Sequence, residues 1–329
     1  MSIDTTPVRH PAAAVRETAP VPRRWTLHGL NNGTIFSATF HGVRLLPRWV
    51  SYAIGYAGTW IAWRAMSDTR RAIAANLAGV LPGESAAALE RRGLTTLRSY
   101  ARDTIDFIRA LSSPSTSTDA LFQTANESGE LFQSLLAQGR GIILVTGHYG
   151  NWEIGSLLVR KTLALPLTIV AMAEADPEVN RLRHQIREML GADTLEVRQS
   201  FDTALQIRRR LAENHMVAML VDRHYGRDRV PVTMFDRRVW FLRTPFLMAY
   251  ATGAPIVPVF IERLRSGYFA PQPHAPIYVL RDRPRDDAIQ QAAQRVADAL
   301  AARIKDHPEF WYHFYRYWDA QDDAYDGLA

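Results

Sequence analysis

The second half of the chain alternates short apolar runs with longer stretches of helical periodicity. The short runs are rich in β-branched residues and predict buried strands at Ile142–Val145, Leu167–Ala171, Thr194–Val197, Val217–Val221, Ile256–Ile261 and Ile277–Leu280. The apolar spacing between them predicts helices at about 151–162, 178–190, 201–213, 243–252 and 285–306. This alternation is typical of an α/β fold in which helices wrap a mainly parallel central sheet.

The first part of the chain has a different pattern. Residues 1–22 are rich in proline, alanine and charge and lack an apolar core, so we expect a disordered tail there and not a signal peptide. Residues 67–113 have the periodicity of helices and form a helical lead-in. We therefore expect one α/β domain over residues 67–329.

Residues 23–66 contain an uncharged segment that is rich in aromatic residues. The stretch "WVSYAIGYAGTWIAW" (49–63) is uncharged and lies between Arg44, Arg48 and Arg64. It is shorter than the roughly 20 apolar residues that a spanning helix needs. Tryptophan and tyrosine beside arginine favour a helix that lies in the membrane interface, so we predict a helical membrane-associating segment. The alternative is a helix that packs on the protein's own core.

Arginine dominates the charge of the protein. The formal net charge is +6, and the chain contains two lysines, Lys161 and Lys305, and no cysteine. The positive charge admits an anionic membrane surface, a phosphorylated substrate or nucleic acid as a partner. The absence of cysteine excludes disulfides, thiolate catalysis and cysteine-type zinc sites.

The stretch "VTGHYGNWEIG" (145–155) places polar side chains where a predicted strand gives way to a helix. Ligands bind at this edge of open α/β sheets. His148 titrates near neutral pH and can take a proton from a hydroxyl group, and Glu153 could fix its tautomer. Gly150 would let the backbone approach a reacting carbonyl group, and Asn151 is a candidate helix cap. The alternative is a capping loop in which His148 is only structural.

Other catalytic schemes lack their motifs. The chain contains no G-x-S-x-G, no G-x-x-x-x-G-K-[ST] and no H-E-x-x-H. We therefore expect no metal and no cofactor. Asp222 directly follows the predicted strand 217–221 and could contact His148 or position Arg183. A simple salt bridge to a neighbouring arginine is the alternative for Asp222.

The motif "GHYGNWE" (147–153) resembles the signature of the bacterial late acyltransferases of lipid A biosynthesis, the lauroyl and myristoyl acyltransferases and their relatives. This family belongs to the glycerolipid-type acyltransferases with a His-x-x-x-x-acid motif. The resemblance extends to "RRAIAANLAGVLP" (70–82), "NRLRHQIREMLGAD" (180–193) and residues 217–260, which end in "TGAPIVPVF". The residues "YGNW" differ from those of the lauroyl and myristoyl branches, which leaves the acceptor open.

The resemblance implies a role for each matching residue. His148 would be the general base and Glu153 its partner, with Asp222 as a third catalytic residue. Substrate would contact Asn180, Arg183, Gly150, Asn151, Arg223 and Arg243, since forked guanidinium groups suit anionic headgroups.

The implied reaction is O-acylation of a lipid hydroxyl by an acyl thioester of acyl carrier protein or coenzyme A. A lipid A precursor is the first acceptor to expect, and another glycolipid or an aminolipid is the alternative. The implied location is the cytoplasmic face of the inner membrane. A rival interpretation is a non-catalytic basic protein that binds membrane or nucleic acid through "RHYGRDR" (223–229) and "IRRRL" (207–211). Because the chain lacks a nucleic-acid motif, we expect no nucleic-acid partner.

Overall fold

The computed structural model of the protein describes residues 33–111, 121–123, 125–172, 177–197 and 201–319. The predicted tail, residues 1–22, lies outside the described residues. The strands are β1 (Ile142–Thr146), β2 (Leu167–Ala171), β3 (Asp193–Glu196), β4 (Met216–Leu220), β5 (Arg229–Met234), β6 (Arg237–Leu242), β7 (Ile256–Arg263) and β8 (Phe269–Pro273). The helices are α2 (Gly33–Leu45), α3 (Arg48–Ala65), α4 (Ser67–Val80), α5 (Ala86–Leu111), α7 (Ala125–Leu136), α8 (Trp152–Leu157), α9 (Pro177–Leu190), α10 (Phe201–Ala212), α11 (Thr244–Thr252) and α12 (Arg285–Asp306).

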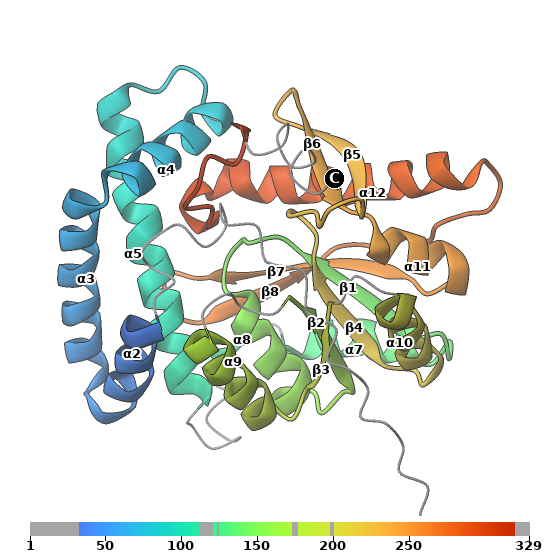
Figure 1. Ribbon diagram of the computed structural model, residues 1–329. Helices are drawn as coiled ribbons and strands as arrows, with labels where there is room; N and C mark the ends of the chain where they lie inside the picture. Colours follow the sequence, from blue (N-terminus) through green and yellow to red (C-terminus); the bar gives the residue numbers. More distant parts are fainter. Residues whose placement is uncertain (1–32, 112–120, 124, 173–176, 198–200, 320–329) are drawn as a thin grey trace, which may run out of the picture.

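A six-stranded sheet with the order β3-β2-β4-β1-β7-β8 forms the centre of the molecule (Figure 1). All neighbouring strands run parallel except β8, which is antiparallel to β7. Side chains of β1 alternate between the two faces of the sheet. Ile143 and Val145 pack into a core with α10, α11 and α12, whereas Ile142 and Leu144 pack into a core with α7. The predicted α/β fold with a mainly parallel sheet is confirmed.

The strand predicted at Ile277–Leu280 is wrong. Ile277 forms only an isolated bridge with Ile256, and the edge strand is β8, which has the sequence FAPQP. Its two prolines argued against a strand in the sequence. An edge strand tolerates proline because one side of it needs no ladder hydrogen bonds.

The hairpin of β5 and β6 is absent from the sequence prediction. Its strands pair from Arg229↔Leu242 to Met234↔Arg237. The turn residues Phe235 and Asp236 have φ of 50° and 58°, a left-handed backbone that two-residue hairpin turns require. Phe-Asp is not one of the dipeptides that signal such a turn, so the sequence contained no turn signal here.

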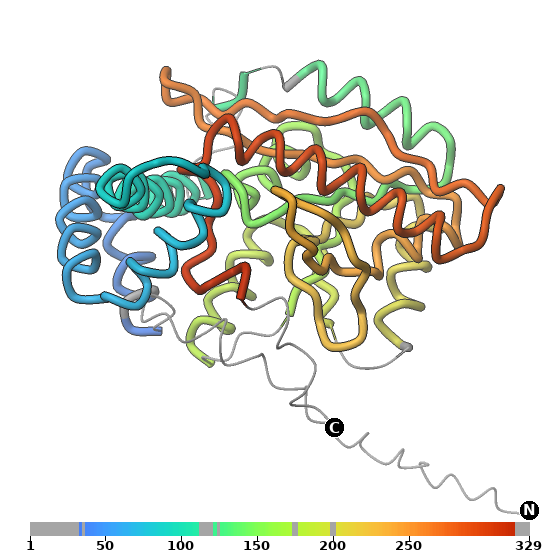
Figure 2. The backbone as a smooth tube through the Cα atoms, turned by 90° about the horizontal axis from the view of Figure 1, so that it is seen from above, coloured from blue at the N-terminus to red at the C-terminus, as the bar shows by residue number. Residues whose placement is uncertain are grey.

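The N-terminal helices α2 and α3 form one end of the molecule, beside α5 (Figures 1 and 2). Arg48 and Tyr52 of α3 bind the carboxylate of Asp106, and Arg263 of β7 pairs with both Asp103 and Asp106. Large apolar side chains of α2, of α3 and of the turn between them are exposed, and these are Leu45, Leu46, Trp49, Ile54, Tyr56, Trp60 and Ile61. Within the described part of the chain, every helix is too short or too polar to cross a membrane.

Candidate active site

The loop after β1 has a shape that its glycine determines. Gly150 has φ of 60°, and a Cβ at this position would lie 2.1 Å from the carbonyl oxygen of Ile261. The Asn151 side chain accepts a hydrogen bond from the N–H of Ile154 at 3.1 Å and so caps α8, as predicted. Its amide also donates to the carbonyl oxygen of Asp103 at 2.9 Å. Gly150 and Asn151 therefore shape the loop. Both also line a smaller cavity together with Trp152, Glu153 and Arg183, so the substrate contact that the resemblance implied stays a prediction.

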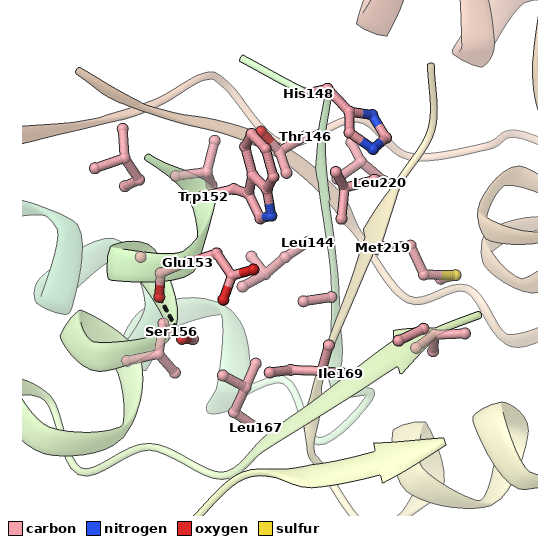
Figure 3. A pocket seen from close by; sticks show the side chains of 18 of the residues that line it. Leu144, Thr146, His148, Trp152, Glu153, Ser156, Leu167, Ile169, Met219 and Leu220 are labelled. Carbon is pink, nitrogen blue, oxygen red and sulfur yellow. Dashed lines mark hydrogen bonds between the residues drawn. The ribbon is translucent and has the colours of Figure 1, made fainter. Parts of the chain in front are cut away.

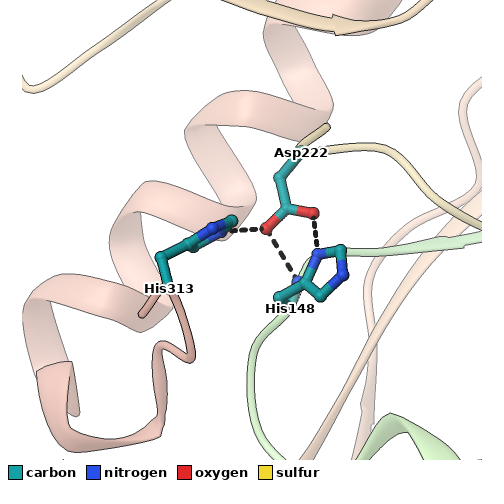
Figure 4. A group of neighbouring side chains, drawn as sticks. All are labelled: His148, Asp222 and His313. Atoms are coloured by element: carbon teal, nitrogen blue, oxygen red, sulfur yellow. Dashed lines mark hydrogen bonds and ion pairs between the residues drawn. The ribbon is translucent and has the colours of Figure 1, made fainter. Parts of the chain in front are cut away.

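Asp222 joins two histidines below this loop (Figure 4). Its Oδ1 lies 2.7 Å from Nδ1 of His148, and its Oδ2 lies 2.9 Å from Nε2 of His313. The backbone N–H of His148 also donates to Oδ2, at 2.7 Å. Because a carboxylate only accepts, Nδ1 of His148 carries the proton and Nε2 keeps its lone pair. No described residue forms a hydrogen bond with that Nε2.

Burial determines the protonation of this group. Burial, and next the charge of Arg223, lowers the pKa of His148 below its ordinary value. Burial alone would raise the pKa of Asp222, but the hydrogen bonds that its carboxylate accepts from His148 and His313 hold the pKa well below the ordinary value. The pKa of His313 falls to about 3, because the ring is buried. At neutral pH the group is therefore an ionised carboxylate between two neutral imidazoles.

A cavity of about 350 Å³ opens beside His148 (Figure 3). Aliphatic side chains of β1, β2 and β4 form its inner wall, among them Leu144, Leu167, Ile169 and Met219. Polar and aromatic residues line it as well, among them Tyr100, His148, Trp152, Glu153, Arg183, Arg187, Arg223, Tyr225 and Tyr312. The volume is in the range of ligand pockets, and the apolar wall suits a hydrocarbon chain.

Glu153 does not take the position that the sequence suggested for it. Its carboxylate pairs with Arg183 of α9 at 2.5 Å, and both residues line the cavity. The ring of Trp152 packs against His148, with the ring centroids 5.4 Å apart. Asp222, and not Glu153, holds the imidazole. Helix α8 turns the Glu153 side chain towards α9, so the short spacing in sequence does not bring the acid to the histidine.

The structure separates the other predicted substrate residues. Arg223 lines the cavity and lies over the ring of Tyr315, 5.1 Å from its centroid. Asn180 is on α9 but is not among the cavity-lining residues. Arg243 is also outside the cavity wall, because its guanidinium pairs with Asp286 at 2.7 Å and its N–H bonds Asp228. The predictions for Asn180 and Arg243 are thus not supported by this geometry.

The pairing of Glu153 with Arg183 predicts coupled mutant effects. We expect Glu153→Gln and Arg183→Gln each to lower kcat/KM, and the double variant to be little worse than the poorer single variant, because both changes break one ion pair. Combining Glu153→Gln with Asp222→Asn should give additive losses. A double-mutant cycle in steady-state kinetics measures both terms. Non-additive losses for Glu153→Gln and Asp222→Asn would instead indicate that Glu153 acts through His148, as the sequence suggested.

Sequence analysis missed His313. The residue follows Trp311 and Tyr312 in an aromatic stretch, and its side chain is fully buried. The sequence pattern of a histidine within an aromatic stretch predicts a structural side chain in the hydrophobic core. No local pattern links this histidine to the loop after β1. Within the described ranges, His148, Asp222 and His313 are also the group close enough to hold a metal ion, with ligand atoms within 4.8 Å of one another. Hydrogen bonds account for this spacing, and the expectation of no metal remains a prediction.

The buried His313 predicts acid instability. The folded pKa of about 3 lies below the ordinary value of 6.5, so between these values the unfolded chain binds a proton that the folded protein does not. Stability is therefore lost as the pH falls below 6.5. Between pH 7 and 5 we expect the wild type to lose about 2 kcal/mol more unfolding free energy than His313→Gln, which can donate to Asp222 without titrating. Urea denaturation at both pH values measures the difference, and equal losses would contradict it.

Comparison with known proteins identifies the family of the chain. A sequence profile described as bacterial lipid A biosynthesis acyltransferase matches residues 23–320. The chain belongs to this family. The resemblance inferred from the sequence is confirmed, and the matched range includes His148 and Glu153.

Curated relatives within this acyltransferase family are identical to the chain at about a quarter of the aligned residues. A phosphatidylinositol mannoside acyltransferase of Mycolicibacterium smegmatis is 27% identical over 191 residues, which is 57% of this chain and 60% of the relative. A protein of the same description from Mycobacterium tuberculosis is 25% identical over 189 residues, or 56% of each chain. The chain thus spans less than two thirds of the length of these relatives.

Proposed function

We propose that the protein is an O-acyltransferase that moves a fatty acyl group from a thioester to a hydroxyl group of a lipid. The observation that carries the proposal is the Asp222–His148 pair at the mouth of an apolar cavity. In a member of the lipid A biosynthesis acyltransferase family, the histidine of such a pair would deprotonate the acceptor hydroxyl group. The apolar cavity wall would contact the acyl chain. No nucleophilic side chain is required, because the acceptor hydroxyl attacks directly.

The residues at the cavity would act in sequence. Nε2 of His148 takes the hydroxyl proton while the oxygen attacks the thioester carbonyl carbon. The charge that develops on the carbonyl oxygen is stabilised by cationic groups of the cavity wall, Arg183 and Arg223. The C–S bond then breaks, and the imidazolium returns its proton to the leaving thiolate. Asp222 stabilises the imidazolium while the proton is on His148.

A lipid A precursor is the first acceptor that we propose, from the family description. A mannosylated phospholipid is the second candidate, because the relatives are described as phosphatidylinositol mannoside acyltransferases. Both acceptors are anionic glycolipids, which suits Arg183 and Arg223 at the cavity. The acyl thioester is a co-substrate, and no other cofactor enters the proposal.

Thiol release tests the reaction. Purified protein is incubated with acyl thioester and either acceptor, and free thiol and lipid products are followed by absorbance and mass spectrometry. Thiol release that requires acceptor and His148 supports the proposal. Loss of one acyl chain from lipid A in a deletion strain would identify the first acceptor, and loss of a glycolipid species would identify the second. Salt-sensitive DNA binding without turnover would favour the rival basic protein.

We also propose that α2 and α3 hold the protein on the cytoplasmic face of the inner membrane. Their exposed apolar side chains lie near Arg44, Arg48 and Arg64, and the Arg64 guanidinium lies 4.1 Å from the centre of the Trp60 ring. Apolar groups beside cations suit the interface of an anionic bilayer. The segment would then both associate with the membrane and pack on the protein's own core, because another side of α3 contacts α5.

This proposal predicts weaker membrane binding on removing the exposed side chains. The variant Trp49→Ser/Ile54→Ser/Ile61→Ser should bind phosphatidylglycerol-containing vesicles at least about tenfold more weakly, since each side chain buries apolar surface in the bilayer. Leu205→Ser, which changes an exposed leucine on α10, is the matched control. Vesicle co-sedimentation measures the binding, and unchanged binding would place the membrane contact elsewhere.

A further inference from the structure

Four arginines lie along one line of helix α5. They are seven, four and seven residues apart, which places them on the same side of a helix, and they are Arg91, Arg98, Arg102 and Arg109. One end of the line is already in use, because Arg109 donates to the carbonyl oxygens of Val43 and Leu46 at the end of α2. Arg98 and Arg102, in the middle of the line, face α3, which lies beside α5 (Figures 1 and 2).

Arg98 and Arg102 lie over two stacked tyrosines of α3. The guanidinium carbon of Arg98 is 5.9 Å from the centre of the Tyr56 ring, and that of Arg102 is 5.4 Å from the centre of the Tyr52 ring. The two rings are nearly parallel, at 9°, with centroids 6.3 Å apart. Arg48 of α3 also lies over Tyr52, at 5.3 Å. Stacking restricts an arginine side chain and lowers the entropy that it loses on binding, so this arginine–tyrosine cluster is already ordered.

The carboxylates beside the cluster are fully used by other arginines. Oδ1 of Asp106 pairs with Arg48 at 3.1 Å, and Oδ2 of Asp106 pairs with Arg263 of β7. Arg263 also pairs with Asp103, at 2.5 Å. Arg48 and Arg263 thus balance the charges of Asp103 and Asp106.

The charges of Arg98 and Arg102 are therefore not balanced locally. In the part of the chain that the structure describes, neither side chain forms an ion pair. Residues 33–67, which include α3, contain three arginines and no carboxylate. Arg98 is exposed and Arg102 is half-buried, so both can be reached from solvent. Two unbalanced positive charges at an accessible site predict an anionic ligand.

The position of the cluster favours a phosphate group of a lipid as this ligand. Planar guanidinium groups match the oxygens of a phosphate group. The Tyr56 side chain is 37% exposed, and Trp60, one turn further along α3, is 46% exposed. Both belong to the exposed side chains that we propose to contact the membrane. Tyrosine and tryptophan at such a surface lie at the level of the lipid headgroups, where a phospholipid has its phosphate group.

We propose that Arg98 and Arg102 bind the phosphate group of an anionic phospholipid of the bilayer, between α3 and α5. The inference rests on the proposed membrane association of α2 and α3 and adds a defined lipid site to it. Tyr100 lies on the opposite side of α5, where it lines the cavity. A lipid phosphate bound on one side of α5 therefore fixes the position of the cavity relative to the bilayer surface.

The test compares two pairs of arginines on the same helix. Arg98→Gln/Arg102→Gln removes the site, and the matched control Arg91→Gln/Arg92→Gln removes two exposed arginines of α5 with the same change in charge. We expect the first variant to bind phosphatidylglycerol-containing vesicles at least about tenfold more weakly than wild type, and the control less than about threefold more weakly. Binding to neutral phosphatidylcholine vesicles should be the same in all three proteins. Vesicle co-sedimentation measures each Kd, and melting temperatures establish that the variants are folded.

A soluble lipid tests the site without a bilayer. Calorimetric titration with short-chain phosphatidylglycerol, below its micelle concentration, should show one saturable site in wild type and none in Arg98→Gln/Arg102→Gln. Arg98→Lys/Arg102→Lys keeps the charge but loses the planar fork, so we expect it to bind this lipid at least about tenfold more weakly than wild type. Inorganic phosphate should bind wild type at least about tenfold more weakly than the lipid, because it lacks acyl chains that could contact the exposed apolar side chains of α3.

Other outcomes overturn the inference. Equal weakening of vesicle binding by the two glutamine variants would reduce the site to the general charge of α5. Equal binding of inorganic phosphate and short-chain lipid would identify a site for free phosphate. A higher KM for the acceptor in detergent, with unchanged vesicle binding, would assign Arg98 and Arg102 to the acceptor. If wild type binds no vesicle, the proposed membrane association fails, and the titration with short-chain lipid still decides whether the site exists.

Discussion

Replacing His148 with alanine is expected to lower kcat by at least about 10²-fold, because the reaction loses the group that takes the hydroxyl proton. Thiol release with a saturating acceptor measures the effect. His307→Ala, which removes a half-exposed imidazole at the end of α12, is the control and should leave kcat unchanged. Circular dichroism and the melting temperature establish that both variants are folded. Near-full activity of a folded His148→Ala protein would end the assignment.

The pH dependence of kcat/KM is a second test of His148 as the general base. Burial and the charge of Arg223 lower the pKa of His148 below 6.5, so the neutral, proton-accepting form persists to more acid pH than for a free histidine. We therefore expect kcat/KM to be constant at neutral pH and to fall only below 6.5. A fall that begins above pH 6.5 would show that a different group titrates.

Replacing Asp222 with asparagine is expected to lower kcat by about 10²- to 10³-fold. The amide retains the size of the side chain but loses the charge that stabilises the imidazolium, and it no longer requires the proton to be on Nδ1 of His148. Asp222 also raises the pKa of His148, against the larger effect of burial, so its loss should move the acid limb of kcat/KM to lower pH.

The shift of the acid limb in Asp222→Asn distinguishes loss of the Asp222–His148 interaction from a general folding defect, because a folding defect would not change the pKa of His148. Asp287→Asn, an exposed carboxylate at the start of α12, is the matched control. Kinetics between pH 5 and 8 with both variants provide the comparison. If Asp222→Asn lowers kcat without any change in the acid limb, Asp222 does not act through His148.

Local pattern was enough to predict the architecture and the position of the proposed base, His148. Five of the six predicted strands exist, because a buried parallel strand is a short β-branched run and the helix after it has its own periodicity. His148 lies two residues after the end of β1, and the carboxyl end of a strand is where α/β sheets bind ligands. The hairpin and β8 were missed because their turn and proline signals are atypical.

The hydrogen-bond partner of His148 was decided by the tertiary structure. Strand β1 pairs with β4 in a register that offsets each residue by 74, as in Thr146↔Leu220, and the same offset places His148 opposite Asp222. Glu153 is five residues from His148, but α8 carries it to Arg183 on the neighbouring helix. His313 reaches Asp222 across 91 residues of chain.

The sequence by itself determined that a histidine ends a buried strand in an α/β acyltransferase fold, because strand, turn and helix signals are local. It did not determine which carboxylate holds that histidine, because strand order and register arise from packing between distant segments. The same packing separates the arginines that follow Asp222. Arg223 lines the cavity, Arg237 and Arg238 lie on the hairpin, and Arg243 pairs with Asp286.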